Sequence, residues 1–406
     1  MDLYPRRRSP LRSRWAGAAA AVLLLAFLSV AVVQAQPQLA ARYLPRTVLD
    51  WLEPWLGAGE AGDKPEASAD HLAAGEAYFR EGQLDEAMDA FRRASELDPE
   101  NAAAHAQLGY TLALRRRYGE AVEVARRAVS LDPTSAAAHA ALAFALDWNG
   151  QYEQAIASAL QALDLDPQSA PALAYLAEAY ADVKRWDEAL ESAERAISLA
   201  PGDFRGHYHL GYVYETMGEY GTAIESYARA ADRAPNLGFI YVQIAINHRA
   251  LSAFDEAVSN LQTAIQVDGG DPVAYEILGR LYYDQEELER AESYFEQAVQ
   301  VDPDYASGFG WLGVANYRRQ RYEEAIQNLA RATELYEALY PGLEARVGLI
   351  PQRVAEYYYL LGWAHVFFGD CDLGLPAFDR AVRLDSSAQA AWEGLEHCGA
   401  ETTQAG

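Results

Sequence analysis

Four histidines are the residues whose spacing first suggests chemistry. They are separated by 34 residues or by a multiple of 34, at His71, His105, His139 and His207. Imidazole is the commonest metal ligand in proteins, so a regular row of histidines could form a metal array. Two nitrogens bound to one zinc ion lie at most about 4 Å apart, whereas packed helices lie about 8–10 Å apart. Histidines one repeat apart therefore cannot easily share an ion, and we predict neither a metal site nor a cofactor.

Aromatic residues replace histidine at the equivalent position later in the chain, namely Tyr241, Tyr275, Phe309 and Tyr358. This exchange of histidine for an aromatic residue indicates that the side chain at this position packs against its neighbours. Elsewhere the sequence contains no Gly-rich phosphate loop, no G-x-S-x-G, no H-E-x-x-H and no paired C-x-x-C. We therefore predict that the protein is not an enzyme.

The two cysteines, Cys371 and Cys398, are the remaining candidates for chemistry. An even number of cysteines in an exported chain favours a disulfide bond between them. The alternative is a pair of small, buried, unbonded side chains, because spacing alone does not establish the geometry that a disulfide requires.

The elements that position these residues repeat every 34 residues. The repeat ends at Pro99, Pro133, Pro167, Pro201, Pro235 and Pro303, with Gly269 in the one intervening place. If the boundary proline is called position 32, alanine occupies position 20 in eight units, from Ala87 to Ala325, and position 27 from Ala94 to Ala332. Position 8 is always glycine or alanine. Small side chains let two helices approach closely, and a fixed period of this length is typical of a solenoid of helix pairs.

The pattern resembles the tetratricopeptide repeat (TPR). The family's aromatic residue at position 11 is matched by Tyr78, Tyr180, Tyr214 and Tyr282, and that at position 24 by Phe91, Tyr227 and Phe295. The resemblance implies an all-α fold, a right-handed superhelical solenoid of about nine helix-turn-helix units with a C-terminal cap helix.

We predict eight units over residues 68–339, an insertion over 340–354 and a degenerate ninth unit over 355–388. A cap helix and tail are expected over 389–406. Residues 36–67 are expected to be a connector with a short amphipathic stretch and a flexible linker.

The start of the chain, residues 1–35, has the composition of a targeting segment. Five arginines precede an apolar run of eighteen residues, from Ala16 to Val33. This length is compatible with an uncleaved membrane anchor and with a signal peptide cleaved after Val33-Gln34-Ala35. In both cases the arginines stay in the cytoplasm and the rest is exported. We therefore expect a single-pass protein of the cell membrane with extracytoplasmic repeats or, alternatively, a secreted protein.

The charge of the chain restricts its partners. The formal charge is −26, and residues 1–35 hold five arginines and one aspartate, which leaves −30 for the remainder. So acidic a body repels phosphate backbones, which excludes nucleic acid as the expected partner and favours basic proteins or peptides.

The resemblance also implies a concave face lined by positions 2, 5, 9, 12 and 13 of each first helix. In chaperone-binding members, Lys or Arg at position 5 and Asn at position 9 of the first unit bind a carboxylate, but here these positions are Leu72 and Glu76. Aromatic and arginine side chains are the usual anchors of protein recognition. The candidates at these positions are Tyr110, Phe144, Trp148, Arg205, Tyr208, Tyr212, Arg249, Arg280, Tyr283, Tyr317, Tyr359 and Trp363.

These observations predict an exported, membrane-anchored TPR scaffold that mediates protein–protein interaction through a concave acidic and aromatic groove. The alternative is a non-catalytic subunit of an envelope enzyme complex or a carbohydrate-binding module, because aromatic grooves also stack on sugars.

Overall fold

The structure is a computed structural model that describes residues 64–340, 342–343 and 349–404. The predicted signal or anchor, residues 1–35, and most of the connector, residues 36–63, lie outside the described residues. None of the helices in the described ranges is both long enough and apolar enough to cross a lipid bilayer. The chain divides into two units after residue 69, and the repeats belong to the second unit.

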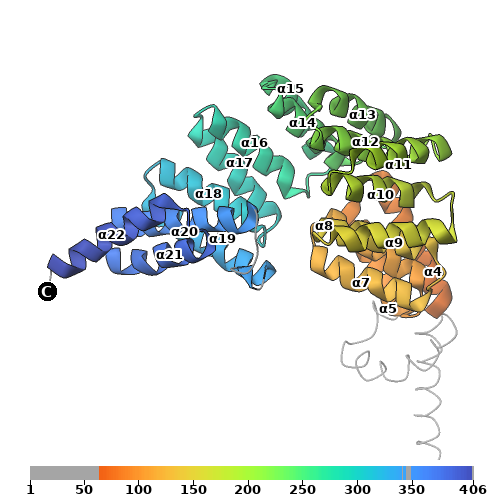
Figure 1. Ribbon diagram of the computed structural model, residues 1–406, viewed down its shortest axis with the longest axis horizontal. Coiled ribbons are helices and arrows are strands. Elements are labelled where there is room, and N and C mark those ends of the chain that lie inside the picture. The colour runs from red at the N-terminus through yellow and green to blue at the C-terminus, as the bar shows by residue number, and fades with distance from the viewer. Residues whose placement is uncertain (1–63, 341, 344–348, 405–406) are drawn as a thin grey trace, which may run out of the picture. The chain divides into compact units, whose positions relative to one another are not determined.

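The described residues form consecutive antiparallel helix pairs and contain no strand (Figure 1). Helices α6 to α18 alternate between 13 and 14 residues, so each pair with its two turns fills one 34-residue period. The prediction of an all-α solenoid is therefore confirmed. The helices are α4 (Lys64–Glu81), α5 (Leu84–Leu97), α6 (Ala102–Leu114), α7 (Tyr118–Leu131), α8 (Ala136–Trp148), α9 (Tyr152–Leu165), α10 (Ala170–Asp182), α11 (Trp186–Leu199), α12 (Phe204–Thr216), α13 (Tyr220–Arg233), α14 (Gly238–Ala250), α15 (Phe254–Val267), α16 (Pro272–Asp284), α17 (Leu288–Val301), α18 (Ala306–Arg318), α19 (Tyr322–Leu339), α20 (Leu349–Phe368), α21 (Cys371–Leu384) and α22 (Gln389–Gln404).

Short polar side chains begin several of the first helices. Asn101 Oδ1 accepts a hydrogen bond from the backbone N–H of Ala104 at 3.0 Å, and Ser135 Oγ accepts one from Ala138 at 3.2 Å. Each cap satisfies one of the N–H groups that have no partner within the helix, which stabilises a helix by about 1 kcal/mol.

The turn between the two helices of a unit has one residue in the left-handed region, and this residue recurs every 34 positions. Its φ is +81° at Gly82, +61° at Arg116 and +74° at Gly150. The same conformation recurs at Lys184, Gly218, Ser252, Glu286 and Gln320. The backbone therefore keeps the register of the sequence through all eight units, including the one that ends at Gly269.

The small residues pack as the sequence predicts. The alanines at positions 20 and 27 have at most 1% of their surface exposed in all eight units. The glycine at position 8 accommodates the large ring at position 24: a Cβ added to Gly279 would lie 2.5 Å from the Phe295 ring, and one added to Gly211 would lie 2.8 Å from Tyr227. A close helix crossing thus requires one of these two positions to be very small.

Two predicted boundaries are wrong. Helix α4 begins at Lys64, within the predicted linker, because Pro65 lies in the first turn, where a proline N–H is not needed. Helix α20 begins at Leu349, six residues before the predicted ninth unit, again with a proline, Pro351, in the first turn. The preceding helix, α19, has 18 residues and is longer than the second helices of the earlier units.

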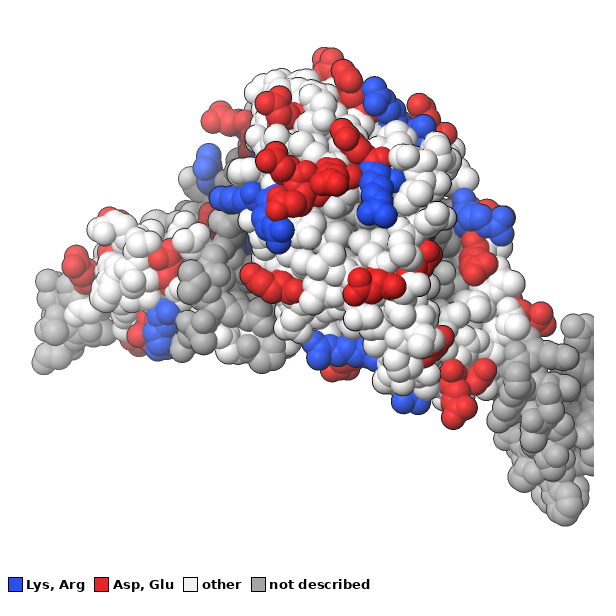
Figure 2. Space-filling model, turned by 45° about the vertical axis from the view of Figure 1, so that its right-hand side comes forward, with Lys and Arg blue, Asp and Glu red and all other residues white. Residues whose placement is uncertain are grey.

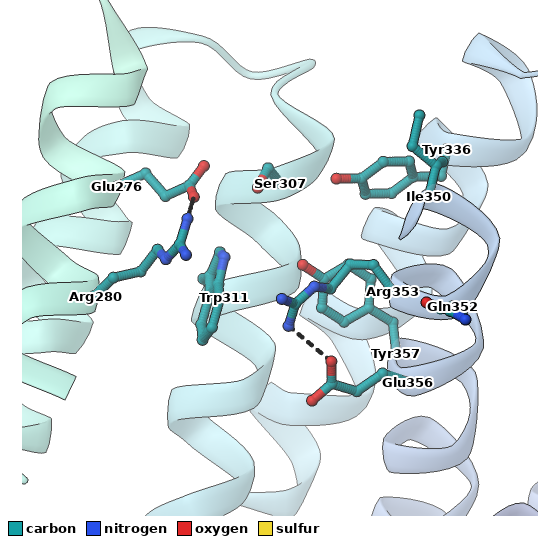
Figure 3. A pocket seen from close by; sticks show the side chains of 10 residues that line it. All are labelled: Glu276, Arg280, Ser307, Trp311, Tyr336, Ile350, Gln352, Arg353, Glu356 and Tyr357. Atoms are coloured by element: carbon teal, nitrogen blue, oxygen red, sulfur yellow. Dashed lines mark hydrogen bonds and ion pairs between the residues drawn. The ribbon is translucent and has the colours of Figure 1, made fainter. Parts of the chain in front are cut away.

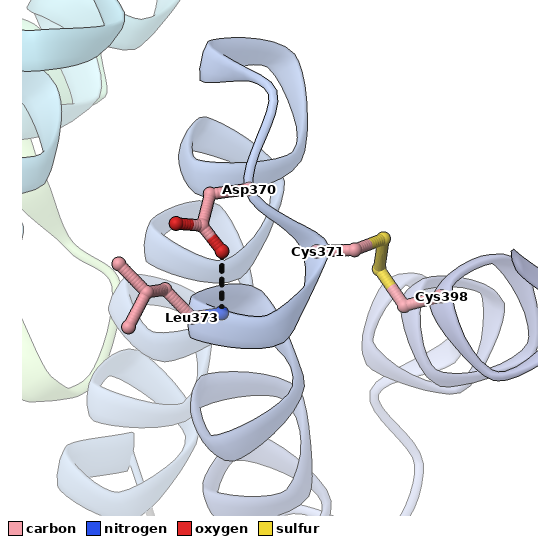
Figure 4. The surroundings of a disulfide bond; sticks show 4 residues. All are labelled: Asp370, Cys371, Leu373 and Cys398. Carbon is pink, nitrogen blue, oxygen red and sulfur yellow. Dashed lines mark hydrogen bonds between the residues drawn. A yellow bond between two sulfur atoms is a disulfide. The ribbon is translucent and has the colours of Figure 1, made fainter. Parts of the chain in front are cut away.

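The C-terminal end carries the predicted cap helix, α22, and the disulfide. Cys371, the first residue of α21, is bonded to Cys398 of α22, and their Cα atoms are 5.4 Å apart (Figure 4). The adjacent Asp370 caps α21 by accepting a hydrogen bond from the Leu373 N–H at 3.0 Å. The disulfide therefore fastens the cap helix to the last repeat.

Contacts also join repeats that are far apart in the sequence. In the turn between α6 and α7, Arg115 donates to Asp268 at 2.8 Å and to Asp85 at 2.9 Å, and Arg116 donates to Asp271 at 2.6 Å. Asp268 and Asp271 lie between α15 and α16. We call these three arginine–aspartate contacts the latch. They hold the second repeat against the boundary of the sixth and seventh.

Candidate binding site

Two of the four periodic histidines, His105 and His139, contact the backbone at the end of the preceding repeat. His105 Nε2 lies 3.2 Å from the carbonyl oxygen of Pro99, and His139 Nε2 lies 3.1 Å from that of Pro133. The hydroxyl of Tyr241 donates to the carbonyl of Pro235 at 3.2 Å in the same way. Histidine and tyrosine therefore fill the same structural role at the repeat boundary. Within the described ranges, no three His, Cys, Asp or Glu side chains converge so that they could hold a metal ion.

The expected groove is filled in the first half of the repeats. Tyr110, Phe144 and Tyr208 are buried, with 5%, 2% and 5% of their surfaces exposed. The rings of Tyr110 and Phe144 are 4.8 Å apart, and Tyr175 packs 4.9 Å from Phe144. The prediction that these three residues are exposed anchors is wrong, because closely packed, mutually tilted aromatic rings from successive first helices occupy the space themselves.

The other predicted groove residues of this half are half-buried, and each contacts a neighbouring side chain. Arg205 donates to Tyr175 Oη at 3.1 Å and to Asp203 at 2.8 Å. Tyr212 donates to Asp182 at 2.6 Å, and Trp148 stacks on Tyr118 at 5.9 Å. These contacts stabilise the closed interior.

Three carboxylates meet in this interior. Asp147 and Glu178 are 3% and 1% exposed, and Asp182 lies beside them on α10. Burial, together with the charges of the other two carboxylates, raises the pKa of Asp147 well above its usual value. Burial also raises the pKa of Asp182 to about 6, although its hydrogen bond from Tyr212 opposes the shift. Because Asp147 and Glu178 are almost inaccessible, the cluster affects stability and is not a surface for a substrate.

The second half of the repeats retains accessible side chains. Arg249, Arg280, Tyr283, Tyr317, Tyr359 and Trp363 are all half-buried. Arg249 and Tyr212 line a cavity of about 620 Å³, in which Arg249 is paired with Asp284 at 3.2 Å. Tyr283 lies 5.8 Å from the ring of Trp311, which lines a second cavity.

This second cavity, the Trp311 cavity, has a volume of about 350 Å³ and lies between α16, α18, α19 and α20 (Figure 3). Of the predicted groove residues, it includes only Arg280. Its lining consists of Glu276, Arg280, Ser307, Trp311, Tyr336, Ile350, Gln352, Arg353, Glu356 and Tyr357.

Two guanidinium groups flank the Trp311 ring. The Cζ atoms of Arg280 and Arg353 lie 4.9 Å and 5.0 Å from the ring centroid, and Figure 3 shows them on opposite sides of it. Each arginine is also paired on its own helix, Arg280 with Glu276 at 3.2 Å and Arg353 with Glu356 at 2.7 Å. Cation–π contact and ion pairing fix both guanidinium planes at the cavity wall.

Two buried polar atoms of the lining have no hydrogen-bond partner among the described residues. They are Arg280 Nε and the hydroxyl oxygen of Tyr357. The Tyr357 ring is completely buried over Gly310, where an added Cβ would lie 2.3 Å from it. Burial raises the pKa of Tyr357 well above its usual value, so the hydroxyl stays protonated and is a donor.

The predicted acidic character does not apply to the Trp311 cavity, whose lining holds two arginines and two glutamates. On the face shown in Figure 2, acidic and basic side chains are interspersed over the helices. On this face the acidic side chains are thus spread over several helices and not confined to one groove.

Sequence reasoning missed most of this cavity for two reasons. Trp311 occupies position 6 of its unit, which is not among the concave positions of the family. Arg353, Glu356 and Tyr357 were placed outside or at the edge of the ninth unit, because its first helix was expected to start at residue 355. The signal that could have corrected this is Pro351, a residue favoured in the first turn of a helix.

Consecutive helix pairs of constant length, small residues at the crossings and a left-handed turn residue every 34 positions define a repeat solenoid of the helix-turn-helix class. Family profiles described as tetratricopeptide repeat match residues 180–237, 278–342 and 359–395, and a second one matches 248–307. A TPR repeat profile matches residues 75–114, and one for subunit 3 of the anaphase-promoting complex, or cyclosome, matches 114–196. The chain belongs to the tetratricopeptide-repeat family. The comparison with curated proteins gives no match.

A solved structure shares the fold, and others are similar over part of the chain. The Cut9–Hcn1 hetero-tetramer of the anaphase-promoting complex superposes with a TM-score of 0.54 at 16% identity, over 77% of this chain and 59% of that chain. This protein therefore spans less than two thirds of that relative. Pilf of Pseudomonas aeruginosa is 25% identical, with a TM-score of 0.36, over 50% of this chain and 92% of its own. Part of a TPR protein from Cytophaga hutchinsonii is 21% identical, with a TM-score of 0.42, over 62% and 98%. The family and fold are those of a protein–protein interaction scaffold, which is generally not catalytic.

Proposed function

We propose that the protein binds a peptide segment of a partner protein in the Trp311 cavity. The observation that carries this proposal is the Arg280–Trp311–Arg353 stack at the wall of a cavity of about 350 Å³. Tryptophan, tyrosine and arginine supply most of the energy of protein interfaces, and they do so when they are held rigidly in a pocket. Both conditions are met here, whereas the inner face of the first half is filled.

Binding of a sugar is not favoured by this geometry. A carbohydrate stacks on a free face of an aromatic ring, but guanidinium groups lie against both faces of Trp311. The carbohydrate-binding alternative therefore lacks an available platform in this cavity.

Site-specific cross-linking tests the proposal in the cell that produces the protein. A photoreactive amino acid is placed at Gln352, which is exposed and lines the cavity, and in a matched strain at Gln300, which is exposed on α17 outside it. The proposal predicts a protein cross-linked from position 352 and not from position 300, with the yield reduced by Trp311→Ala. Equal cross-linking from both positions, or a yield independent of Trp311, would contradict it.

We also propose that the repeats are exported and tethered to the membrane by the N-terminal segment. Arginines before an apolar run of eighteen residues support this location, and so does the Cys371–Cys398 disulfide, a bond typical of oxidising compartments. Protease treatment of intact spheroplasts should digest the repeats. Mass determination of the native N-terminus should show residues before 35 retained, whereas a start near residue 36 would indicate a cleaved signal.

We further propose that the partner protein is basic overall and is attracted to the repeats by long-range electrostatics. A charge of −30 after residue 35 accelerates the approach of a positively charged protein, and salt screens this effect. The association rate with the cross-linked partner should fall as ionic strength rises. A rate that is independent of salt would contradict steering by charge.

A further inference from the structure

The Trp311 cavity has unused hydrogen-bond donors, while each of its two glutamates already accepts a hydrogen bond from an arginine of the lining. Glu276 accepts hydrogen bonds from Tyr305 and Arg280, and Glu356 accepts one from Arg353. By contrast, Arg280 Nε and the Tyr357 hydroxyl are buried and have no partner among the described residues. A buried donor without an acceptor is destabilising, so a ligand that supplies acceptors to these two groups binds more tightly than one that does not.

Further donors surround the same space. Figure 3 shows the hydroxyls of Ser307 and Tyr336 directed toward the cavity between Glu276 and Arg353. Burial raises the pKa of Tyr336, against the effect of its hydrogen bond with Ser307, and the phenol therefore remains protonated. The two glutamates of the lining are already paired with its two arginines, so the groups left to contact a ligand are mainly donors. The site thus favours a group that accepts several hydrogen bonds.

The charge of the lining distinguishes among anions. The two arginines are balanced by two glutamates, so the cavity does not have the excess positive charge that a dianionic phosphate would need. A carboxylate carries one charge, has two acceptor oxygens and matches the planar donor edge of a guanidinium group.

We propose that the Trp311 cavity binds a carboxylate of the partner peptide, which accepts hydrogen bonds from Arg353 and Tyr357 on one side of the Trp311 ring. This inference rests on the proposed function of the cavity. The carboxylate is an Asp or Glu side chain or the C-terminus of the peptide. The residues that line the cavity come from units seven to nine, whereas the first unit holds Leu72 and Glu76 where carboxylate-binding relatives hold a basic residue and asparagine.

Peptide selection on the full-length protein tests this assignment. Two displayed libraries of random 12-residue peptides, one with free C-termini and one with internal display, are selected against the wild type, and enriched peptides are synthesised. Each is then compared with versions in which Asp or Glu becomes Asn or Gln, or the C-terminus becomes an amide. We expect one of these changes to weaken binding at least tenfold, and this change identifies the source of the carboxylate.

The protein variants provide the matched control. Arg353→Gln and Arg331→Gln each remove an arginine of similar exposure, 39% and 37%, that is paired with glutamate three residues away, but only Arg353 lines the cavity. We expect Arg353→Gln to weaken binding of the acidic peptide at least tenfold and to weaken binding of its neutral version much less. Arg331→Gln should leave both unchanged.

The outcomes separate the two claims. Peptides that lose binding on Trp311→Ala but tolerate neutralisation of their carboxylates overturn the carboxylate assignment and leave the proposed function intact. Failure to enrich any peptide, or enrichment of peptides insensitive to Trp311→Ala, contradicts the proposed function and this inference with it. Equal loss of affinity in Arg331→Gln and Arg353→Gln also overturns the assignment.

Discussion

The side chains of Arg115 and Asp268 form an ion pair at 2.8 Å although 153 residues separate them in the sequence. Both are nearly buried, with 9% and 8% of their side-chain surfaces exposed. Nearby, Leu84 of α5 packs into a cluster that contains Phe204, Tyr227 and Leu237. The early repeats therefore contact repeats near the middle of the chain. The same repeats are those whose inner face is filled by aromatic side chains.

Removal of the latch should loosen both sides of this contact. Arg115→Gln leaves the nearly buried carboxylate of Asp268 without its charged partner, and loss of one member of a buried pair costs about 3–5 kcal/mol. We expect faster hydrogen–deuterium exchange in α4–α7 and α13–α16, with α18–α21 unchanged. Arg93→Gln, which removes an exposed arginine paired with Glu96, is the control. Unchanged exchange in both variants would mean that the latch does not hold the repeats together.

The latch should also weaken in acid. Burial alone would raise the pKa of Asp271, but the charge of Arg116, the N–H of Val273 and the charge of Arg115 lower it overall. A carboxylate whose pKa is lowered on folding contributes stability that is present above its unfolded pKa and lost as the pH falls through the folded value. The exchange difference between wild type and Arg116→Gln, which removes the partner of Asp271, should therefore shrink as the pH approaches 3.

The buried carboxylates near Asp182 have the opposite effect on stability, which they lower as the pH rises. The pKa of Asp182 is raised to about 6, so the folded protein binds its proton more tightly than the unfolded chain does. Stability must then fall as the pH rises from about 4 to about 6, and the loss is complete above that range. Asp182→Asn still accepts the hydrogen bond from Tyr212, and should raise Tm at pH 7.5 by about 2–4 °C.

This gain should vanish at pH 4, where the wild-type carboxyl group is protonated in the folded state. Differential scanning calorimetry at the two pH values provides the measurement, with Asp187→Asn as a control that removes an exposed charge on α11 outside the cluster. A gain of the same size at both pH values would contradict the raised pKa.

The packing of the repeats could be predicted because it depends on residues that are close in sequence. Gly279 and Phe295 are sixteen residues apart, and the 34-residue pattern places both at one helix crossing. The contact between Arg115 and Asp268 depends instead on small rotations that accumulate over several repeats, which a local pattern does not encode. The Trp311 cavity was missed for a related reason, since Tyr336 and Arg353 lie on helices extended beyond the regular repeat.

The crossing of α16 and α17 can be tested directly. Gly279→Ala places a Cβ 2.5 Å from the Phe295 ring and should destabilise the protein by about 1–3 kcal/mol. A second change, Phe295→Leu, should recover part of this loss by removing the ring. Gly221→Ala, at an exposed position of α13, meets no atom within 4 Å and should be neutral or slightly stabilising. Chemical denaturation measures all four proteins, and equal effects of the two alanine substitutions would refute the assigned packing.

The disulfide should stabilise the cap helix specifically. It closes a loop with a sequence separation of 27 residues, for which the chain-entropy argument gives about 3–4 kcal/mol. In Cys371→Ser/Cys398→Ser, we expect exchange to accelerate in α22 and the adjacent part of α21, while α6–α13 stay protected. Protection of α22 equal to that of the wild type would show that apolar packing alone holds the cap.

The most direct test of the binding function is the equilibrium affinity of the purified cross-linked partner for the full-length protein and for Trp311→Ala. Circular dichroism and Tm establish that the variant is folded, and Tyr110→Phe, in the filled interior, serves as the matched aromatic control. The account predicts a loss of at least tenfold in affinity for Trp311→Ala and less than twofold for Tyr110→Phe. Wild-type affinity in a folded Trp311→Ala protein would contradict the assignment of this cavity as the binding site.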